Sequence, residues 1–292
     1  MSATDFSDAA LVLVGHGTTL NEASAAPVYL HAAELRRRKL FAEVREGFWK
    51  QEPKVTGVIE SVSAARLFIV PFFISEGYFS ENIIPQALGF HFKSGSREGR
   101  AVQRGRQAVY YTLAVGSHER MTEVLLERAQ GVVRQFPFPR APQPKELTLF
   151  VAGHGTAQDA QSRAVVDRQV ELIQAKNIYA AVHAIFLDEE PRIPTCFGTA
   201  HTRNIVVVPF FISDGLHVAE DIPVLLGEPG RVVRARLEKG QASWRNPTEK
   251  NGKLIWYSGA VGTEGALAEV ILERVREASL WEPQREPLSK AE

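Results

Sequence analysis

Cysteine is almost absent from this chain, whose 292 residues contain only Cys196. A single cysteine excludes an internal disulfide, and it excludes an iron–sulfur cluster held by several thiolates of this chain. An excess of charge of one sign is also lacking, because 34 basic residues balance 34 acidic ones. This balance gives no indication of nucleic acid or an anionic membrane as a partner.

Long apolar runs and targeting signals are missing as well. The longest apolar run, Leu67 to Ile74, is far shorter than the roughly 20 residues of a membrane span, and it contains Pro71. The first eight residues carry acidic side chains but no basic ones, which is unlike a signal peptide. We therefore expect a cytoplasmic protein without a membrane or nucleic-acid partner.

Nucleotide-binding and common hydrolase motifs are absent too. The chain has no Gly-x4-Gly-Lys-Ser/Thr loop, and Leu20 stands where a dinucleotide fingerprint would need glycine or alanine. Cys-x-x-Cys, His-Glu-x-x-His and Gly-x-Ser-x-Gly are also missing. We expect no bound nucleotide.

What the chain does contain is an internal repeat. The segment at residues 13–18, which includes Gly-His-Gly-Thr, returns 138 residues later at 151–156. The same spacing relates Val-Pro-Phe-Phe-Ile-Ser at 70–75 to its copy at 208–213. One spacing shared by separated blocks indicates a duplicated domain.

Each half alternates short apolar runs with amphipathic stretches, which is the pattern of βαβ units on a parallel sheet. We expect an α/β fold of two similar lobes, residues 1–138 and 139–292, joined by a proline-rich linker at 136–145. The expected strands are 10–14, 44–49, 66–70, 108–113, 147–152, 181–187, 204–208 and 254–258. The expected helices are 27–39, 53–63, 122–134, 164–175 and 264–278.

The side chains suited to chemistry follow the predicted strand ends. His16 and His154 each lie between two glycines after the first strand of a half, Asp188 ends a second strand, and His217 follows a third. Ligands of open α/β sheets bind beyond the carboxyl ends of the strands. Imidazole and carboxylate groups bind first-row divalent metals and transfer protons.

Each of these residues also has a plainer interpretation. His154 could cap its turn, His217 could be a surface loop residue, and Asp188 could simply favour the start of the next helix. The first half carries Phe79 at the position of His217 and Lys50 at that of Asp188. Since that half needs no histidine there, packing does not account for His217.

Three motifs together resemble the ATP-independent (class II) chelatases of the CbiX type. They are Gly-His-Gly, Phe-Leu-Asp-Glu-Glu-Pro, and Pro-Phe-Phe-Ile-Ser-Asp-Gly-Leu-His-x4-Ile-Pro, and the resemblance covers residues 8–135 and 146–280. It implies two lobes, each with a four-stranded parallel sheet flanked by helices. It also implies insertion of Co²⁺ or Fe²⁺, with Ni²⁺ as a further candidate, into sirohydrochlorin, a tetrapyrrole with eight carboxylates, in cobalamin or siroheme biosynthesis.

The resemblance also assigns roles by position. His154 and His217 match the family's metal-handling histidines, and Asp188 stands where the family usually has glutamate, so these three are the implied catalytic and metal-binding residues. Basic loops at 91–107 and 231–245 would pair with the substrate's carboxylates. The implied tetrapyrrole-binding residues are His16, Phe79, Ser213 and Gly215. We expect a monomer whose two lobes replace a homodimer, with a dimer as the alternative.

Two other functions stay open from the sequence. Lys50 and Phe79 indicate that one site has eroded, which would suit a non-catalytic tetrapyrrole or metal carrier derived from a chelatase. A phosphoryl-transfer or hydrolytic enzyme using His154 is the second, although Gly153 occupies the arginine position of the phosphatase Arg-His-Gly motif. The metal and the exact tetrapyrrole are not decided by these residues.

Overall fold

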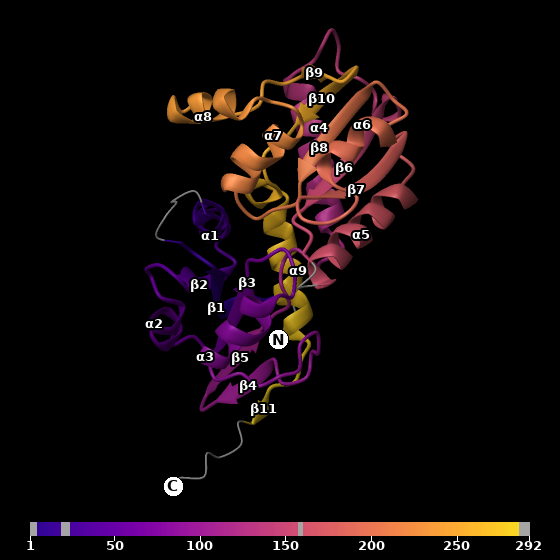
Figure 1. Cartoon of the computed structure of the whole chain (residues 1–292). Helices are drawn as coiled ribbons and strands as arrows, with labels where there is room; N and C mark the ends of the chain where they lie inside the picture. Colours follow the sequence, from indigo (N-terminus) through magenta and orange to yellow (C-terminus); the bar gives the residue numbers. More distant parts are fainter. Residues whose placement is uncertain (1–4, 19–23, 157–159, 286–292) are drawn as a thin grey trace. The chain divides into compact units, whose positions relative to one another are not determined.

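The computed structural model describes residues 5–18, 24–156 and 160–285. The chain forms two compact units, each built on one sheet with helices against it (Figure 1). Unit 1 comprises residues 1–118 and 268–292, and unit 2 comprises residues 119–267.

The sheet of unit 1 has the strand order β11-β4-β5-β3-β1-β2. Strands β5, β3, β1 and β2 are parallel, whereas β4 pairs with β5 in the antiparallel sense. The strands are β1 (Phe6–Gly15), β2 (Phe41–Phe48), β3 (Arg66–Pro71), β4 (Ala101–Arg104), β5 (Gln107–Tyr111) and β11 (Gln284–Arg285). The helices are α1 (Ala26–Arg38), α2 (Val55–Glu60), the π-helical turn η2 (Phe79–Ile83), α3 (Ile84–Ala87) and α9 (Leu267–Ser279).

Unit 2 repeats this plan with the strand order β7-β6-β8-β10-β9. Its first four strands are parallel, and β9 is antiparallel to β10. The strands are β6 (Leu147–Gly153), β7 (Ala181–Phe186), β8 (Asn204–Pro209), β9 (Thr248–Lys250) and β10 (Lys253–Tyr257). The helices and helical turns are α4 (Met121–Gln135), η3 (Pro144–Glu146), α5 (Ala160–Ala175), η4 (Ile193–Thr195), α6 (Cys196–Thr199), η5 (His217–Asp221), α7 (Ile222–Leu225), α8 (Gly230–Glu238) and η6 (Val261–Thr263).

The predicted α/β fold is confirmed, and all eight predicted strands form the parallel core of the two sheets. The prediction of four strands a sheet is wrong in detail, because the sheets have six and five strands. The additional strands β4 and β9 each extend the fourth parallel strand as an antiparallel neighbour, and β11 pairs with β4 at the edge of the first sheet. Strand β9 is Thr-Glu-Lys and only partly buried, so it lacks the apolar pattern by which a strand is predicted.

The last helix of each repeat belongs to the unit of the other repeat. Helix α4 lies in unit 2, where the Trp256 indole donates a hydrogen bond to the Phe136 carbonyl just after α4 (2.8 Å). In unit 1, Arg274 of α9 donates to the Ala114 carbonyl (3.0 Å) and the Ser117 hydroxyl (2.7 Å). The division at residues 138/139 thus remains a prediction about the repeats, and the compact units follow a different division.

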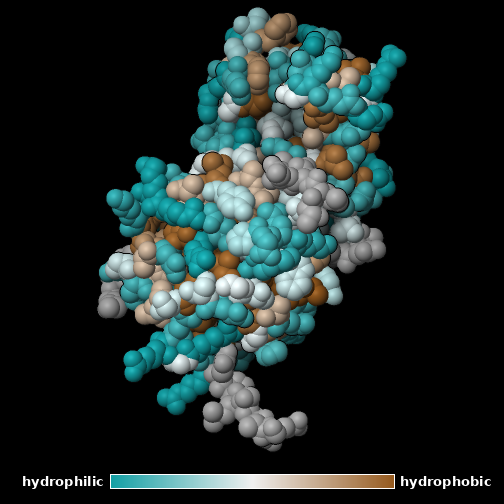
Figure 2. Space-filling view, turned by 90° about the vertical axis from the view of Figure 1, so that its left-hand side faces the viewer, coloured by the Kyte–Doolittle hydropathy of each residue, from teal (hydrophilic) through white to brown (hydrophobic). Residues whose placement is uncertain are grey.

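The core of each unit consists of apolar side chains on both faces of its sheet. Leu11 and Phe68 in unit 1, and Phe150 and Trp256 in unit 2, have no solvent exposure. On the face drawn in Figure 2, polar residues predominate and apolar ones form scattered patches. Over the described residues, no helix has both the length and the apolar character needed to cross a membrane.

Candidate functional site

The Gly-His-Gly turns have the same backbone geometry in both units. The second glycine of each, Gly17 and Gly155, has a φ of 68° and 63°, a left-handed conformation that glycine adopts without steric cost. The His154 carbonyl accepts a hydrogen bond from the Asp188 amide (3.1 Å). The Lys50 amide donates to His16 in the same way (2.8 Å). The residue two positions beyond the second strand, Lys50 or Asp188, is therefore held beside the histidine in both units.

The segment after the third strand is tethered equally in both units. The Asp214 carboxylate accepts a hydrogen bond from the Ala260 amide (2.7 Å), and Glu76 accepts one from Ala114 (3.1 Å). A π-helical turn then begins at His217 in unit 2 and at Phe79 in unit 1. The two repeats thus place residues 217 and 79 equivalently, and they differ in the side chain.

In unit 2 the three predicted site residues lie together beyond the carboxyl ends of the parallel strands, an edge of the sheet that we call the rim. The rings of His154 and His217 lie 5.0 Å apart, centre to centre, and nearly perpendicular. The Asp188 carboxylate lies 3.4 Å from Nδ1 of His154. All three side chains are partly or largely exposed. Across the described parts of the chain, no three His, Cys, Asp or Glu side chains form a group that could hold a metal ion on its own.

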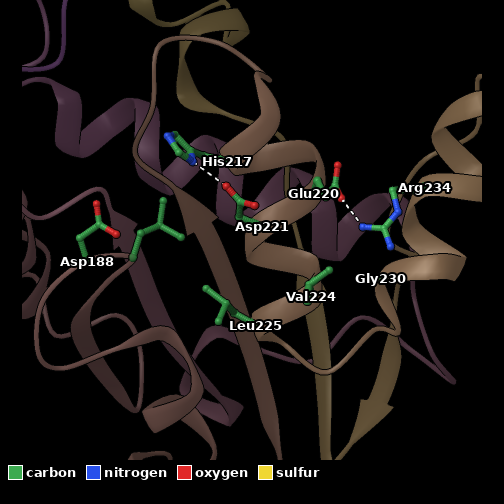
Figure 3. A pocket seen from close by; sticks show the side chains of 9 residues that line it. Asp188, His217, Glu220, Asp221, Val224, Leu225, Gly230 and Arg234 are labelled. Atoms are coloured by element: carbon green, nitrogen blue, oxygen red, sulfur yellow. Dashed lines mark hydrogen bonds and ion pairs between the residues drawn. The ribbon is translucent and has the colours of Figure 1, made fainter.

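A cavity of about 400 Å³ opens beside His217. Figure 3 shows His217 and Asp221 pointing toward one another, and Nδ1 of His217 lies 2.7 Å from the Asp221 carboxylate. Arg234 of α8 donates to Glu220 within the same cavity (2.9 Å). The lining includes Asp188, His217, Glu220, Asp221, Val224 and Arg234. The cavity therefore joins carboxylates, a cation and apolar side chains next to the histidine pair.

The equivalent rim of unit 1 has the opposite charge. His16 packs edge-on against Phe79, with 4.5 Å between the ring centres, and Nζ of Lys50 lies 5.6 Å from the centre of the Phe79 ring. Burial, and secondly the positive charge of Lys50, lowers the pKa of His16 below its usual value. The substitutions therefore replace an acidic, histidine-rich rim by an aromatic and cationic one.

The predicted substrate-binding residues fall in both units. His16 and Phe79 belong to unit 1, whereas Ser213 and Gly215 belong to unit 2. The Gly215 carbonyl accepts hydrogen bonds from the Val218 and Ala219 amides, so this residue begins the turn that carries His217. The contacts of these four residues with a tetrapyrrole stay predictions.

The expectation that the basic loops pair with substrate carboxylates is wrong for two arginines. Arg100 is fully buried and donates to the Glu81 carboxylate (2.5 Å). Arg236 is largely buried and donates to Glu228 (3.0 Å). Acidic side chains of the same unit already neutralise both guanidinium groups. The sequence contained one indication of the Glu81–Arg100 pair. The repeat partner of Glu81 is Ala219, so only the first half has an acidic residue at this position.

Comparison with known families decides the classification. The CbiX family model matches the chain twice, at residues 10–132 and 148–278. The chain belongs to the CbiX family. Each match covers most of one sequence repeat, so both halves are CbiX-like.

Similar proteins and a similar solved structure agree with this result. The chain is 36% identical to a "probable sirohydrochlorin cobaltochelatase" of Halobacterium salinarum, over 92% of this chain and 91% of that one. A "sirohydrochlorin cobaltochelatase" of Methanopyrus kandleri is 26% identical and matches over 45% of this chain and 96% of its own length. A multi-domain Deinococcus radiodurans protein, described as structurally similar to chelatases, superposes with a TM-score of 0.74 and 25% identity. That match covers 91% of this chain and 54% of that longer one.

One residue next to His217 escaped the sequence analysis. Asp221 lies inside the "x4" of the His-x4-Ile-Pro motif, where no role was predicted for it. The sequence contained one indication of this role, because the repeat partner of Asp221 is Ile83. The second half therefore has both the histidine and the aspartate, whereas the first half has neither.

Proposed function

We propose that this CbiX-family chain inserts a divalent metal ion, Co²⁺ or Fe²⁺, into sirohydrochlorin without ATP, and that unit 2 carries the reaction. The observation that supports this most is the pair of imidazoles 5.0 Å apart beside Asp188, at an exposed rim. The names of its relatives favour cobalt as the metal. They lend no support to the carrier or hydrolase alternatives.

Metal insertion replaces two pyrrole N–H protons by one divalent ion. A catalyst must therefore present the ion and accept protons at the same face of the ring. In the proposal, His154 and His217 bind the ion, since imidazole nitrogen suits first-row metals such as Co²⁺ and Fe²⁺. Asp188, whose carboxylate lies 3.4 Å from His154, receives protons. A small, exposed ligand set lets the ion pass on to the four pyrrole nitrogens.

The remaining features of the rim fit a large, flat and acidic substrate. Leu216, the residue before His217, is 69% exposed and offers an apolar surface to the macrocycle. In unit 1, Lys50 at the position of Asp188 repels a divalent cation, so we assign metal binding to unit 2 alone. The proposal takes the chain to act in the cytoplasm as a monomer, without nucleotide or iron–sulfur cluster.

The test is Co²⁺ insertion into sirohydrochlorin, followed by the change in absorbance of the macrocycle. We expect His154→Ala and His217→Ala each to lower the insertion rate by about 100-fold, because each removes a group that handles the metal or its protons. His201→Ala is the matched control, since His201 is exposed in the same unit but precedes strand β8, at the opposite edge of the sheet. An unaltered chain that does no better than the non-enzymatic rate would contradict the proposal.

A further inference from the structure

His217 has a carboxylate partner on its own helical turn. Oδ2 of Asp221 lies 2.7 Å from Nδ1 of His217, a distance typical of a charge-assisted hydrogen bond. The two residues are the first and last of the π-helical turn η5, and each side chain is about half exposed (Figure 3). The Asp221 side chain therefore contacts His217 across one helical turn, and both side chains line the cavity.

The repeat shows that the turn does not need this pair. In unit 1 the same π-helical turn, η2, runs from Phe79 to Ile83 and is followed by a short helix that begins with Ile-Pro, as in unit 2. Phe79 and Ile83 cannot form the hydrogen bond. The same π-helical turn thus forms without it, and the aspartate occurs in the copy that has the histidine. A purely structural role does not explain this pairing.

A carboxylate at Nδ1 decides which nitrogen of an imidazole is free. It holds the proton on Nδ1, which leaves the lone pair of Nε2 available to a metal ion, and it fixes the ring orientation. The neighbouring acid Glu220 does not compete for this role, because it pairs with Arg234. Asp188 approaches the other histidine, His154.

We propose that Asp221 is a positioning residue for the metal substrate: it orients His217 and presets Nε2 as the ligand of the incoming divalent ion. The inference rests on the proposed function and adds to it a residue that does not itself bind the metal. Carboxylate partners of this kind typically change metal affinity by about 10- to 100-fold when they are removed.

Two substitutions and one control test this in the full chain. Asp221→Ile installs the residue that unit 1 carries on the equivalent turn, and Asp221→Asn keeps an acceptor oxygen but removes the charge. Glu220→Gln removes the same charge from the adjacent residue, which lines the same cavity but pairs with Arg234. Co²⁺ alone is the probe, and its binding is followed through its visible absorption bands.

We expect Asp221→Ile to weaken Co²⁺ binding by about 10- to 100-fold and Asp221→Asn by less. The KM for Co²⁺ should rise in parallel, whereas the KM for sirohydrochlorin and the melting temperature should stay unchanged. Glu220→Gln should alter Co²⁺ affinity by no more than about twofold, since Arg234 already neutralises the charge of Glu220. Unchanged Co²⁺ affinity in Asp221→Ile, or an equal loss in Glu220→Gln, would overturn the inference.

The tautomer of His217 gives a second readout that needs neither metal nor turnover. Nitrogen-15 NMR of the metal-free chain should show the proton on Nδ1 in the unaltered protein, and a shift toward Nε2 in Asp221→Ile. A ring that is already protonated on Nε2 in the unaltered chain contradicts the positioning role. If His217→Ala leaves Co²⁺ binding and insertion intact, the proposed function of this site fails as well. If His217→Ala impairs both and Asp221→Ile neither, only the positioning role fails.

Discussion

At the scale of single residues, two substitutions separate the rims of the two units. Lys50 and Phe79 occupy backbone positions equivalent to those of Asp188 and His217, and the ammonium group of Lys50 lies over the Phe79 ring. A cation over an aromatic face is stabilised by the ring quadrupole. The remaining imidazole, His16, therefore lies beside a fixed positive charge instead of a carboxylate.

This arrangement predicts how His16 titrates when Lys50 is removed. Burial and the Lys50 charge both disfavour the imidazolium ion, so the pKa of His16 is lowered. In Lys50→Met the pKa should rise but stay below the usual value, because burial, the larger cause, remains. Proton NMR of the imidazole resonances across pH measures it.

The lowered pKa of His16 also determines how the stability of the fold depends on pH. The folded state binds fewer protons at His16 than the unfolded chain, so this residue contributes stability at neutral pH that is lost as pH falls through the lowered pKa. In Lys50→Met, less stability should be lost as the pH falls. Lys54→Met, which removes a nearby lysine with a different partner, is the control. A His16 pKa that stays the same or falls in Lys50→Met would contradict the electrostatic explanation.

The sequence was informative about site residues wherever the backbone alone determines position. The proximity of His154, Asp188 and His217 follows from strand order, because the carboxyl ends of neighbouring parallel strands meet at one edge. The pairing of Asp221 with His217 and the buried pair of Glu81 and Arg100 were not predicted. Such pairs depend on which rotamers the packed neighbours permit, and strand position carries no information about that.

At the scale of elements, strongly apolar strands were predictable and short polar elements were not. The eight strands of the parallel cores fall where they were expected, and each contains β-branched or aromatic residues. Helix α8, which supplies Arg234 to the cavity, lies in a stretch with many charges, and its N-terminus is marked only by Pro229 and Gly230. Its contact with the turn η5 is the ion pair of Arg234 with Glu220.

Helix α9 carries an ion pair that makes its attachment sensitive to acid. Glu277 accepts a hydrogen bond from Arg274 (2.8 Å) and lies 3.5 Å from His118. Hydrogen bonding from His118, and then from Arg274, lowers the pKa of Glu277 to about 2. A carboxylate whose pKa is lowered on folding contributes stability above its usual pKa, and this stability is lost as pH falls toward the lowered value.

We therefore expect Glu277→Gln to be less stable than the unaltered chain at pH 7, by up to about 1 kcal/mol because the pair is partly exposed. The difference should shrink between pH 4.5 and pH 2. Urea unfolding at several pH values measures both effects. Glu273→Gln removes another carboxylate–arginine pair from the same helix and serves as the control. A constant difference across this pH range would show that Glu277 acts through packing instead.

At the scale of the whole molecule, the duplication was predictable but the exchange of helices was not. The repeat is visible as one spacing, and relatives of about half the length match it. Helices α4 and α9, however, are equivalent in the two repeats, and each has an apolar face suited to either sheet. The sequence pattern therefore does not distinguish packing within a repeat from packing on the other unit.

Duplication also explains how one copy can carry the proposed metal ligands while the other has the same fold without them. The Gly-His-Gly turn and the π-helical turn occur in both units, so unit 1 has the backbone frame of the proposed metal site without two of its side chains. If side chains alone make the difference, restoring them should restore metal binding.

The substitutions Lys50→Asp, Phe79→His and Ile83→Asp together copy the ligands and the positioning residue of unit 2 onto unit 1. We expect the bound Co²⁺ at saturation, measured by equilibrium dialysis and elemental analysis, to rise from one ion per chain to two. Replacing the same three residues by alanine removes Lys50 and Phe79 without supplying ligands, and this control should still bind one ion. A folded triple variant that also binds one ion would show that the frame itself has diverged, and that the asymmetry of the two units lies in their backbones rather than in the residues at positions 50, 79 and 83.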